Sequence, residues 1–430
     1  MSSKPRLNSR FLPILVIALF ILQLTDPSRV WTILLVGLGG LWLISYVWAR
    51  SLAEWLTILR EMRYGWVQVG DLLEERFTLE NKSWLPATWV ELEDHSTLPG
   101  YNASVVSGVD GSGTNRWRKT GVCNRRGLYQ LGDTSIHTSD PFGIYSVTIA
   151  DPARVSIMVM PPVVPLPDLD IIPGGYSGDG RPIPNAPERT VDASSVREYM
   201  PGDSLRLVHW RTTARYEKPF VRLFDGAPAS DWWILLDLQA ASQVGEGEDS
   251  TEEHSVILAA SLADRGLRAH RGVGLVLNGK NLDWLPPRAG SGQRWEILRS
   301  LALASRGDTS LGEVLEHARP NLGRNASLLI ITPTASLDWL KTLPLLDRRG
   351  IRSTVFLLDL QSFDQDLDNS RVADELGKIH VPCHNIPREF LDRPEAQPGT
   401  RGQWEWRITP TGRAVPVHTP DDHRWQRLAK

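Results

Sequence analysis

The sequence predicts a mixed fold, α/β plus all-β: an N-terminal helical hairpin, an antiparallel β-sandwich, and a doubly wound domain with a parallel sheet. Three observations predict it. Two uncharged apolar runs, residues 11–24 and 30–49, open the chain. Short alternating runs broken by turn residues follow from 66 to 161, without a competing helical period. Beyond residue 226, continuous apolar runs alternate with segments of helical spacing, as in βα units.

The two apolar runs predict a transmembrane hairpin. At about 1.5 Å per residue, residues 30–49 span roughly 30 Å, the thickness of one bilayer core. Residues 11–24 are short and would span by recruiting neighbours or by thinning the bilayer. A cleaved signal peptide is the alternative, but no small-x-small cleavage site precedes Thr25, and the second run follows at once.

Basic residues predict the orientation of this hairpin. They lie outside the two runs at Lys4, Arg6, Arg10, Arg50, Arg60 and Arg63, against Arg29 alone between them. The positive-inside rule then places both termini in the cytoplasm and the protein in the cell (inner) membrane. The two cysteines, Cys123 and Cys383, form no C-x-x-C pair, which fits a reducing compartment.

Seven segments are expected along the chain. They are a hairpin anchor (1–50), a juxtamembrane connector (51–65), the β-sandwich (66–161), a Pro/Gly-rich linker or exposed loop (162–190), a charged motif (191–225), the α/β domain (226–392), and a C-terminal hairpin and tail (393–430) whose last dozen residues are expected to be loose. Within the sandwich, "TSDPFGIY" (138–145) predicts a turn, because Asp140 precedes a proline and Gly143 permits positive φ.

The α/β domain is expected to alternate regularly. Strands are predicted over 231–238, 272–279, 327–333 and 352–360, and helices over 252–269, 292–305 and 336–350. A further helix begins at Ser310, where Glu313 completes a capping box. Pro344 is expected to kink the helix over 336–350.

Residues 196–225, "VREYMPGDSLRLVHWRTTARYEKPFVRLFD", mix six basic residues with aromatics and four acids. This near balance, and 47 basic against 50 acidic residues overall, disfavours nucleic-acid binding. The "PGD" predicts a turn in which Asp203 caps a helix over about 204–215, and "FVRLF" predicts a strand. Because arginine pairs bidentately with carboxylates, the motif is either an internal brace or, if exposed, a docking face for a protein partner.

The sequence offers little for catalysis. It contains no Gly-x-Ser-x-Gly elbow and no Gly-x-x-x-x-Gly-Lys-Ser/Thr phosphate loop. "HVPCH" (380–384) has three zinc-ligand types, but no second pair at suitable spacing. His209 beside Trp210 is more typical of a packed or surface residue than of a base. We therefore expect a protein without enzymatic activity, catalytic residues or cofactor.

One carboxylate stands where an open parallel sheet places its site, at the end of the run 231–238: Asp237. The layout resembles a von Willebrand factor A-type domain, whose Asp-x-Ser-x-Ser loop binds a divalent metal through several oxygens. This chain has Gln239 and Ala241 at the serine positions, and Pro333 where a later aspartate belongs. Thr309, in a Gly-x-Thr, would approach Asp237. The resemblance implies a degenerate site with these two remnants, and disfavours Mg²⁺.

The charged motif resembles the signature of the bacterial domain-of-unknown-function 58 proteins, as do residues 125–145 and the Pro/Gly-rich stretch from 161. The signature residues are Arg197, Glu198, Tyr199, Pro201, Gly202, Asp203, Arg206, Trp210, Arg211, Arg215 and Arg222. The resemblance implies association with MoxR-type AAA+ ATPases and a role in assembling or maturing other complexes. It predicts a membrane-anchored scaffold that docks such an ATPase or its client. The alternative is a divalent-metal-dependent ligand-binding domain.

Overall fold

The computed structural model describes residues 5–62, 65–174, 193–199, 208–216, 218–224, 231–280, 282–323 and 326–391, and the backbone of 405–408, 414–418 and 426–427. Within these ranges, residues 193–197 and 222–224 are described by their backbone alone. The chain forms two compact units. Unit 1 comprises Met1–Met160 with Pro398–Lys430, and unit 2 comprises Pro161–Gln397.

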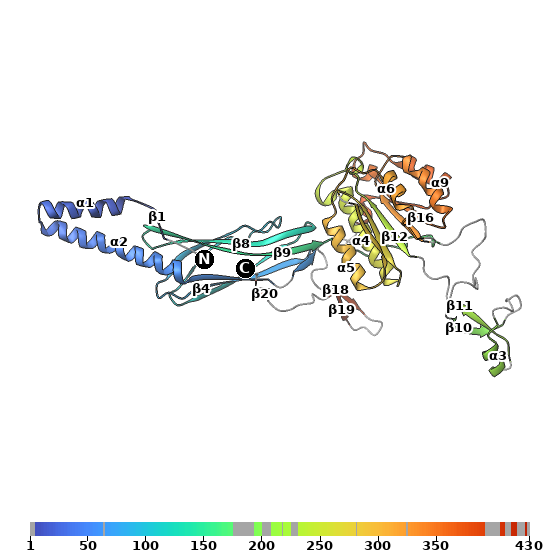
Figure 1. The fold of residues 1–430 in the computed structure, drawn as a ribbon, viewed down its shortest axis with the longest axis horizontal. Helices are drawn as coiled ribbons and strands as arrows, with labels where there is room; N and C mark the ends of the chain where they lie inside the picture. Colours follow the sequence, from blue (N-terminus) through green and yellow to red (C-terminus); the bar gives the residue numbers. More distant parts are fainter. Residues whose placement is uncertain are drawn as a thin grey trace. The chain divides into compact units, whose positions relative to one another are not determined.

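Unit 1 begins with two apolar helices, α1 (Phe11–Thr25) and α2 (Arg29–Trp55), which lie side by side (Figure 1). The side chain of Ser28 caps α2 by accepting a hydrogen bond from the Val30 N–H. By length and composition α2 can cross a membrane, whereas α1 is apolar but shorter. Much of the pair faces outward from the protein; Ile33, for example, is 72% exposed.

Two sheets follow in unit 1. One has the order β1-β9-β8-β5-β6, with β3 parallel to β9, and the other has the order β20-β2-β4-β7. The strands are β1 (Arg6–Leu7), β2 (Leu56–Met62), β3 (Trp66–Gln68), β4 (Leu72–Asn81), β5 (Ala87–Asp94), β6 (Val105–Val109), β7 (Thr114–Val122), β8 (Gly127–Ser139), β9 (Tyr145–Met160) and β20 (Gln426–Arg427). Apart from the β3–β9 pair, neighbouring strands in both sheets are antiparallel.

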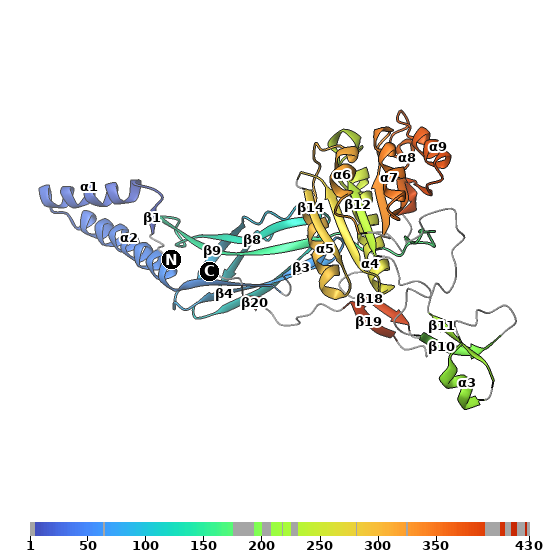
Figure 2. The ribbon, with the colours of Figure 1, turned by 45° about the vertical axis from the view of Figure 1, so that its right-hand side comes forward.

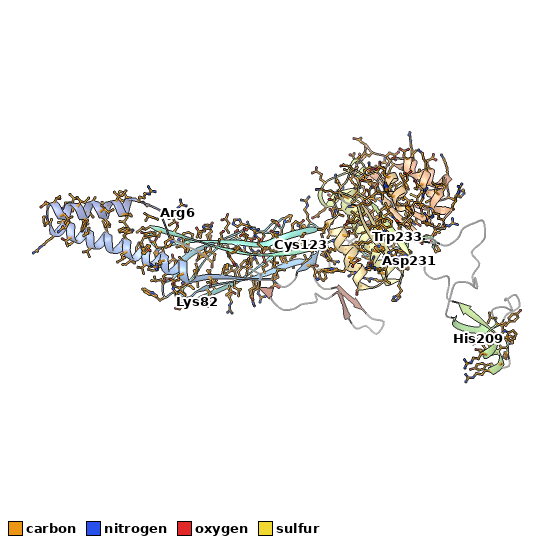
Figure 3. The ribbon with its side chains drawn as sticks, viewed as in Figure 1. Arg6, Lys82, Cys123, His209, Asp231 and Trp233 are labelled. Atoms are coloured by element: carbon orange, nitrogen blue, oxygen red, sulfur yellow. The ribbon has the colours of Figure 1, made fainter. Side chains whose placement is uncertain are left out.

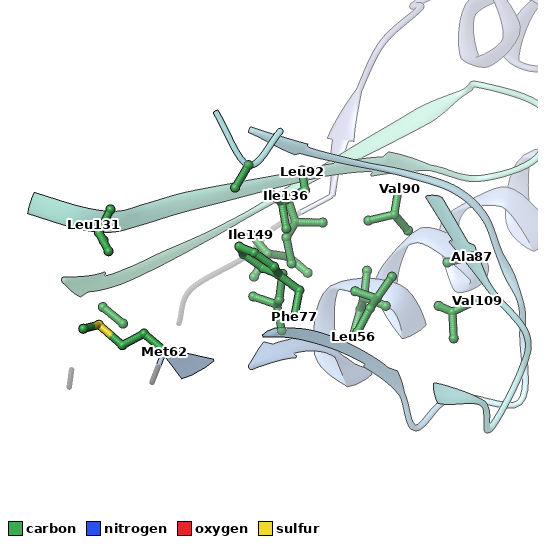
Figure 4. Close-up of a cluster of buried hydrophobic side chains, with 14 of the residues drawn as sticks. Leu56, Met62, Phe77, Ala87, Val90, Leu92, Val109, Leu131, Ile136 and Ile149 are labelled. Carbon is green, nitrogen blue, oxygen red and sulfur yellow. The ribbon is translucent and has the colours of Figure 1, made fainter. Parts of the chain in front are cut away.

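The hydrophobic core of unit 1 lies between these sheets (Figure 4). Alternate residues point inward, because successive side chains of a strand face opposite sides; Phe77 on β4 and Ile136 on β8 are 0% exposed. The segment 51–65, which was expected to be a connector, contains the end of α2 and strand β2. The first residue of β2 follows α2 directly, so the long apolar helix obscured the alternating pattern "LTILREM".

Two further features of unit 1 bear on the predictions. The turn at 138–145 is confirmed: Gly143 has φ 70°, and the Asp140 carboxylate accepts hydrogen bonds from the Phe142 and Tyr145 N–H groups. The last residues were expected to be loose, but Gln426 and Arg427 pair with Met62 and Glu61 on β2. A hairpin is also present, formed by β18 (Glu405–Ile408) and β19 (Ala414–His418).

Unit 2 contains a six-stranded sheet in the order β14-β13-β12-β15-β16-β17. Its strands are β12 (Trp232–Asp237), β13 (Val273–Asn278), β14 (Leu282–Arg288), β15 (Ser327–Thr332), β16 (Arg352–Leu358) and β17 (Cys383–Ile386). Neighbours are parallel except for β14, which is antiparallel to β13. Strands β12, β13 and β15 are buried throughout, which explains their continuous apolar runs.

Helices cover both faces of this sheet (Figure 2). On one face are α4 (Thr251–Arg268) and α5 (Ser291–Leu303), which contact each other and the central strands. On the other are α6 (Leu311–Ala318), the 3₁₀ helix η4 (Asp338–Thr342), α7 (Leu343–Asp347) and α9 (Ser370–Lys378). Short elements complete the unit: η2 (Ala240–Ser242), η3 (Gly247–Asp249), α8 (Leu360–Phe363) and η5 (Arg388–Phe390). The cap at Ser310 is confirmed, since its hydroxyl accepts the Glu313 N–H.

The start of the expected linker is fixed along unit 2. The Val164 N–H donates to the Ser261 hydroxyl on α4 (3.0 Å), and Arg265 donates to the Pro167 carbonyl (2.8 Å). The Ile172 carbonyl accepts from the Ser327 hydroxyl at the start of β15 (3.0 Å). Residues 161–174 therefore differ from a free linker, because side chains of unit 2 satisfy their backbone groups. Residues 175–192 lie outside the described part of the chain.

Candidate functional site

The charged motif forms a small module within unit 2. Strand β10 (Ala193–Glu198) pairs antiparallel with β11 (Phe220–Phe224), so that Arg197 is opposite Val221 and Glu198 is opposite Phe220. The helix α3 (Trp210–Tyr216) connects to β11 through the Thr213 hydroxyl, which accepts the Phe220 N–H at 3.0 Å. At its start, the His209 ring nitrogen and the Thr212 hydroxyl lie 2.6 Å apart (Figure 3). His209 is thus engaged in holding the first turn of α3.

Four exposed residues of α3 are aromatic or basic. Trp210 is 70% exposed and Tyr216 is 59% exposed. Arg211 and Arg215 are exposed as well, and the Arg215 guanidinium lies 5.8 Å from the centre of the Tyr216 ring. In contrast, Val208 and Val221 are only 6% and 2% exposed. We call Trp210, Arg211, Arg215 and Tyr216 the α3 face.

The structure locates part of the expected signature. Glu198 and Tyr199 lie at the end of β10; Lys218 pairs with Glu198 at 3.4 Å, and the Tyr199 N–H donates to the Pro219 carbonyl. Arg197 and Arg222 are placed in β10 and β11 by their backbone. The helix expected over about 204–215 is observed as Trp210–Tyr216. Pro201, Gly202, Asp203 and Arg206 lie outside the described residues, and so does the expected cap.

Asp237 lies at the carboxyl end of β12 and is completely buried. Both of its carboxylate oxygens are engaged. Oδ2 accepts the Thr332 hydroxyl at 2.7 Å, while Oδ1 accepts the Gln239 N–H at 3.1 Å and the Asn278 amide at 3.3 Å. Burial raises the pKa of Asp237, and these three donors counteract it. We call Asp237, Asn278 and Thr332 the Asp237 cluster.

Thr309, the second expected metal remnant, is near this cluster, but its hydroxyl makes no hydrogen bond with Asp237, and the residue is exposed. Its backbone carbonyl accepts a hydrogen bond from the Asn278 amide at 2.9 Å. Asn278 thus joins the loop containing Thr309 to Asp237. Among the described residues, no group of three His, Cys, Asp or Glu side chains is arranged to hold a metal ion.

Gly307 explains how the loop before α6 reaches the end of β12. It pairs with Gln239 in an isolated parallel bridge, and its N–H donates to the Leu238 carbonyl at 3.0 Å. A side chain at Gly307 would collide with the Gly279 backbone, so only glycine allows this close approach. Residues 307–309 therefore contact the ends of two strands, β12 and β13.

The sequence analysis missed two members of the Asp237 cluster, Asn278 and Thr332. A signal for them was present: each is the polar residue that ends an apolar run, in "GVGLVLN" and "SLLIIT". Parallel strands bring their carboxyl ends to one edge of a sheet, so three polar run-ends imply one cluster. The comparison with the metal-binding pattern considered only position 333, so the adjacent Thr332 was overlooked.

A second polar network, also missed, lies inside unit 1. Arg60 on β2 is 3% exposed and donates to both Glu75 oxygens, at 2.8 and 2.7 Å, and to Asp94 at 2.6 Å. The Tyr101 hydroxyl donates to Glu75 at 2.5 Å; burial and the adjacent carboxylate raise the pKa of Tyr101. From the sequence, Arg60 was interpreted only as one of the basic residues that predict the orientation of the hairpin in the membrane. In the structure it links the two sheets, because Glu75 lies on β4 and Asp94 on β5.

Neither cysteine is poised as a nucleophile. Cys123 is fully buried, and burial, with the charge of Asp71, raises the pKa of its thiol to about 12. Burial raises the pKa of Cys383 to about 11. Both therefore remain thiols at neutral pH, whereas a nucleophilic cysteine acts as the thiolate.

A family described as "Protein of unknown function DUF58" matches residues 195–364, from β10 through α8. Over these residues the chain is similar to the DUF58 family. The matched part contains both the α3 face and the Asp237 cluster. Unit 1 lies outside the match.

Curated relatives match over a similar share of the chain. An uncharacterized protein of Mycobacterium bovis is 25% identical over 170 residues, which is 38% of this chain and 53% of the relative. An uncharacterized protein of Mycobacterium tuberculosis matches to the same extent. The uncharacterized protein YeaD of Bacillus subtilis is 29% identical over 169 residues, or 38% of this chain and 39% of YeaD. The match thus spans about half the length of the mycobacterial relatives.

Two solved structures resemble this chain only slightly. A β-glucosidase from Listeria innocua is 10% identical, covers 24% of this chain and 16% of its own, and has a TM-score of 0.18. A CARDB domain from Pyrococcus furiosus is 11% identical, covers 25% of this chain and 90% of its own, and has a TM-score of 0.19. Neither likeness supports an inference about this chain.

Proposed function

We propose that this protein is a membrane-anchored scaffold or adaptor without enzymatic activity, which docks a protein partner through the α3 face. The observation that supports it is the exposure of Trp210 (70%) and Tyr216 (59%) beside two exposed arginines. Trp, Tyr and Arg are the side chains that dominate binding energy at protein interfaces. An internal brace would bury these side chains against carboxylates.

The partner that fits this face carries acidic residues around an apolar pocket. Arg211 and Arg215 would meet the carboxylates, which favours encounter and fixes orientation, while Trp210 would fill the pocket. The resemblance to DUF58 proteins points to a MoxR-type AAA+ ATPase, or to its client, as this partner. Nucleic acid does not fit, since the motif combines its basic residues with acids such as Glu198.

The anchor in this proposal is a two-pass hairpin of α1 and α2. Arg6, Arg10 and Arg50 flank the pair on the side of the sandwich, and Arg29 alone lies at the opposite side. The positive-inside rule then puts the sandwich, unit 2 and both termini in the cytoplasm, at the inner membrane. A cytoplasmic location is also compatible with two cysteines that form no disulfide.

Unit 2 is proposed to be a von Willebrand factor A-like domain. Its support is a parallel sheet covered by helices on both faces, with an aspartate at the carboxyl end of β12. The alternative function, metal-dependent ligand binding at Asp237 and Thr309, is less well supported. A metal ion would have to displace donors from a carboxylate that already accepts three hydrogen bonds. No cofactor is therefore part of the proposal.

The test is affinity capture of the full-length protein from membranes in gentle detergent, read by mass spectrometry. The variant Arg211→Glu with Arg215→Glu reverses two charges of the α3 face. Its matched control is Arg299→Glu with Arg319→Glu, which makes the same charge change at an exposed residue of α5 and at the exposed residue that follows α6.

The proposal expects an AAA+ ATPase, or a client shared with one, to be recovered by the wild type and the control. Recovery should fall at least tenfold with the α3 variant. Equal recovery by both double variants would contradict docking through this face. Loss of the partner in Asp237→Ala, with the α3 variant unaffected, would favour the metal-dependent alternative instead.

A further inference from the structure

Both helices of the anchor meet the sandwich at the same end. Strand β1, directly before α1, pairs with β9 so that Leu7 is opposite Tyr145. The later part of α2 packs at that place too: the Trp42 indole N–H donates to the Tyr145 hydroxyl at 2.7 Å, and the Tyr46 ring meets Tyr145 edge-on. Further along, Ala49 and Leu52 are completely buried against the sandwich core. Figure 1 shows α1 and α2 extending together from this end.

The part of the hairpin that extends beyond the sandwich is short for a bilayer. Leu12 on α1 and Leu41 on α2 already pack against the sandwich core. At about 1.5 Å per residue, Arg29–Leu41 rises about 20 Å, and the free part of α1 rises about as much. A bilayer hydrocarbon core is about 30 Å thick. The hairpin therefore falls roughly 10 Å short when the sandwich stays outside the membrane.

If the sandwich stayed outside the membrane, the tip of the hairpin would lie inside the hydrocarbon core instead of reaching the far headgroups. The tip contains an acidic residue between the helices, Asp26, and a basic one at the first position of α2, Arg29. Leaving charges in hydrocarbon is expensive, at about 3 kcal/mol or more for each. This free-energy cost is avoided when the end of the sandwich enters the near interface, because the tip of the hairpin then reaches the far headgroups.

The surface at this end has the side chains that such an environment favours. Trp84 is 77% exposed, Phe142 is 56% exposed and Trp89 is 38% exposed. Trp84 precedes Pro86, whose carbonyl accepts the indole N–H of Trp48 on α2 at 3.0 Å. Phe142 belongs to the 138–145 turn beside β1. Aromatic residues of this kind gather at headgroup level in membrane proteins.

The charges around this end suit anionic headgroups. Arg6, Arg10 and Arg50 are exposed there, against two exposed acids, Glu54 on α2 and Asp110 in the loop beside Trp84. Lys82, shown in Figure 3, pairs with Glu80 at 3.6 Å. Basic residues close to a membrane surface each gain about 1 kcal/mol from an anionic leaflet.

We infer that this end of the sandwich is embedded in the interfacial layer of an anionic bilayer. The embedded surface, which we call the aromatic collar, consists of Trp84, Trp89 and Phe142 with Arg10 and Arg50. The inference rests on the membrane anchor of the proposed function and extends it. Unit 1 then contacts the membrane through the end of its sandwich as well as through α1 and α2.

The test measures how deeply single positions lie in the membrane. Full-length protein in nanodiscs containing phosphatidylglycerol is spin-labelled at one introduced cysteine in a Cys383→Ser background, since Cys123 is fully buried. Collision with oxygen, which concentrates in lipid, is compared with collision with a water-soluble nickel chelate. The test positions are Trp84→Cys and Phe142→Cys.

Two other positions calibrate the measurement. Leu128→Cys is the matched control, because Leu128 is an exposed apolar residue (53%) at the start of β8, whereas the collar adjoins the end of that strand. Ile33→Cys on α2 reports the hairpin itself. We expect nickel accessibility at positions 84 and 142 to be at least threefold lower than at 128, with Ile33 lower still.

The outcomes separate the two proposals. If Ile33 lies in lipid while positions 84 and 142 are as accessible to nickel as 128, the collar is wrong and the anchor stands. If Ile33 is itself accessible to nickel, the anchor is wrong and the collar falls with it. Replacing phosphatidylglycerol by phosphatidylcholine should raise the accessibility of positions 84 and 142 and leave Ile33 unchanged.

Discussion

Asp237 joins three strand ends through its carboxylate, which accepts from Thr332, Gln239 and Asn278. Asp237→Ala leaves those buried donors without an acceptor. We expect it to lower the free energy of unfolding by about 2–4 kcal/mol. Chemical denaturation of the full-length protein in detergent measures the change. Thr309→Ala, at an exposed side chain, should change stability by less than about 0.5 kcal/mol.

The same residue distinguishes a structural role from a metal site. If Asp237 is structural, millimolar Mg²⁺ should leave the unfolding midpoint of the wild type unchanged. A ligand that binds only the folded state would raise it. An increase that disappears in Asp237→Ala would show that the site retains metal affinity.

Asp71 should make the stability of unit 1 decrease as the pH rises. It is 5% exposed, and burial raises its pKa to about 6, although the Gln68 N–H donates to it. An unfolded aspartate has a pKa of about 3.9, so between these values the folded state binds the extra proton. Asp71 should therefore lower stability as pH rises from about 4 to about 6, and the loss should remain above that range.

Asp71→Asn should remove this dependence, since its amide oxygen can still accept the Gln68 N–H. We expect it to stabilise the protein by about 3 kcal/mol at pH 7 and by little at pH 4. Thermal unfolding of both forms across this pH range measures the difference. Equal gains at pH 4 and pH 7 would rule out ionisation of Asp71 as the cause.

Among the elements, β2 and β5 are joined across the sandwich by Arg60. Arg60→Met would leave Glu75 and Asp94 buried without their cation, and breaking a buried ion pair costs about 3–5 kcal/mol. The control is Arg118→Met, which removes an exposed partner of Glu74 and should cost less than about 1 kcal/mol. A comparable cost for the two variants in denaturant unfolding would contradict the central role of Arg60.

The elements also show which parts of the fold could be predicted. Strands β12, β13 and β15 were located within two residues, because strands buried on both faces are continuous apolar runs. Strand β17 is four residues of mixed polarity, and β14 contains two prolines, so neither has such a signal. The Asp237 cluster was only partly found, because Asn278 and Thr332 acquire their role from strand order. Arg60 was misassigned, since pairing with Glu75 and Asp94 depends on which strands face each other.

At the scale of the whole molecule, the chain combines a candidate membrane span with two folded units. The family match lies in unit 2, which contains the α3 face. We propose that this face docks a partner while the N-terminal helices hold the protein at the membrane. In this proposal aromatic and basic side chains of the motif bind the partner, and Asp237 contributes to stability.

The most direct test places a photo-crosslinking amino acid at Trp210 of the full-length protein in cells, with Trp295 as the control. Trp295 lies on α5 and is also exposed, at 40%. The account predicts that position 210 crosslinks to an AAA+ ATPase or to a client that co-purifies with one, and that position 295 does not. The same products from both positions, or none from position 210 while such an ATPase co-purifies, would contradict docking through the α3 face.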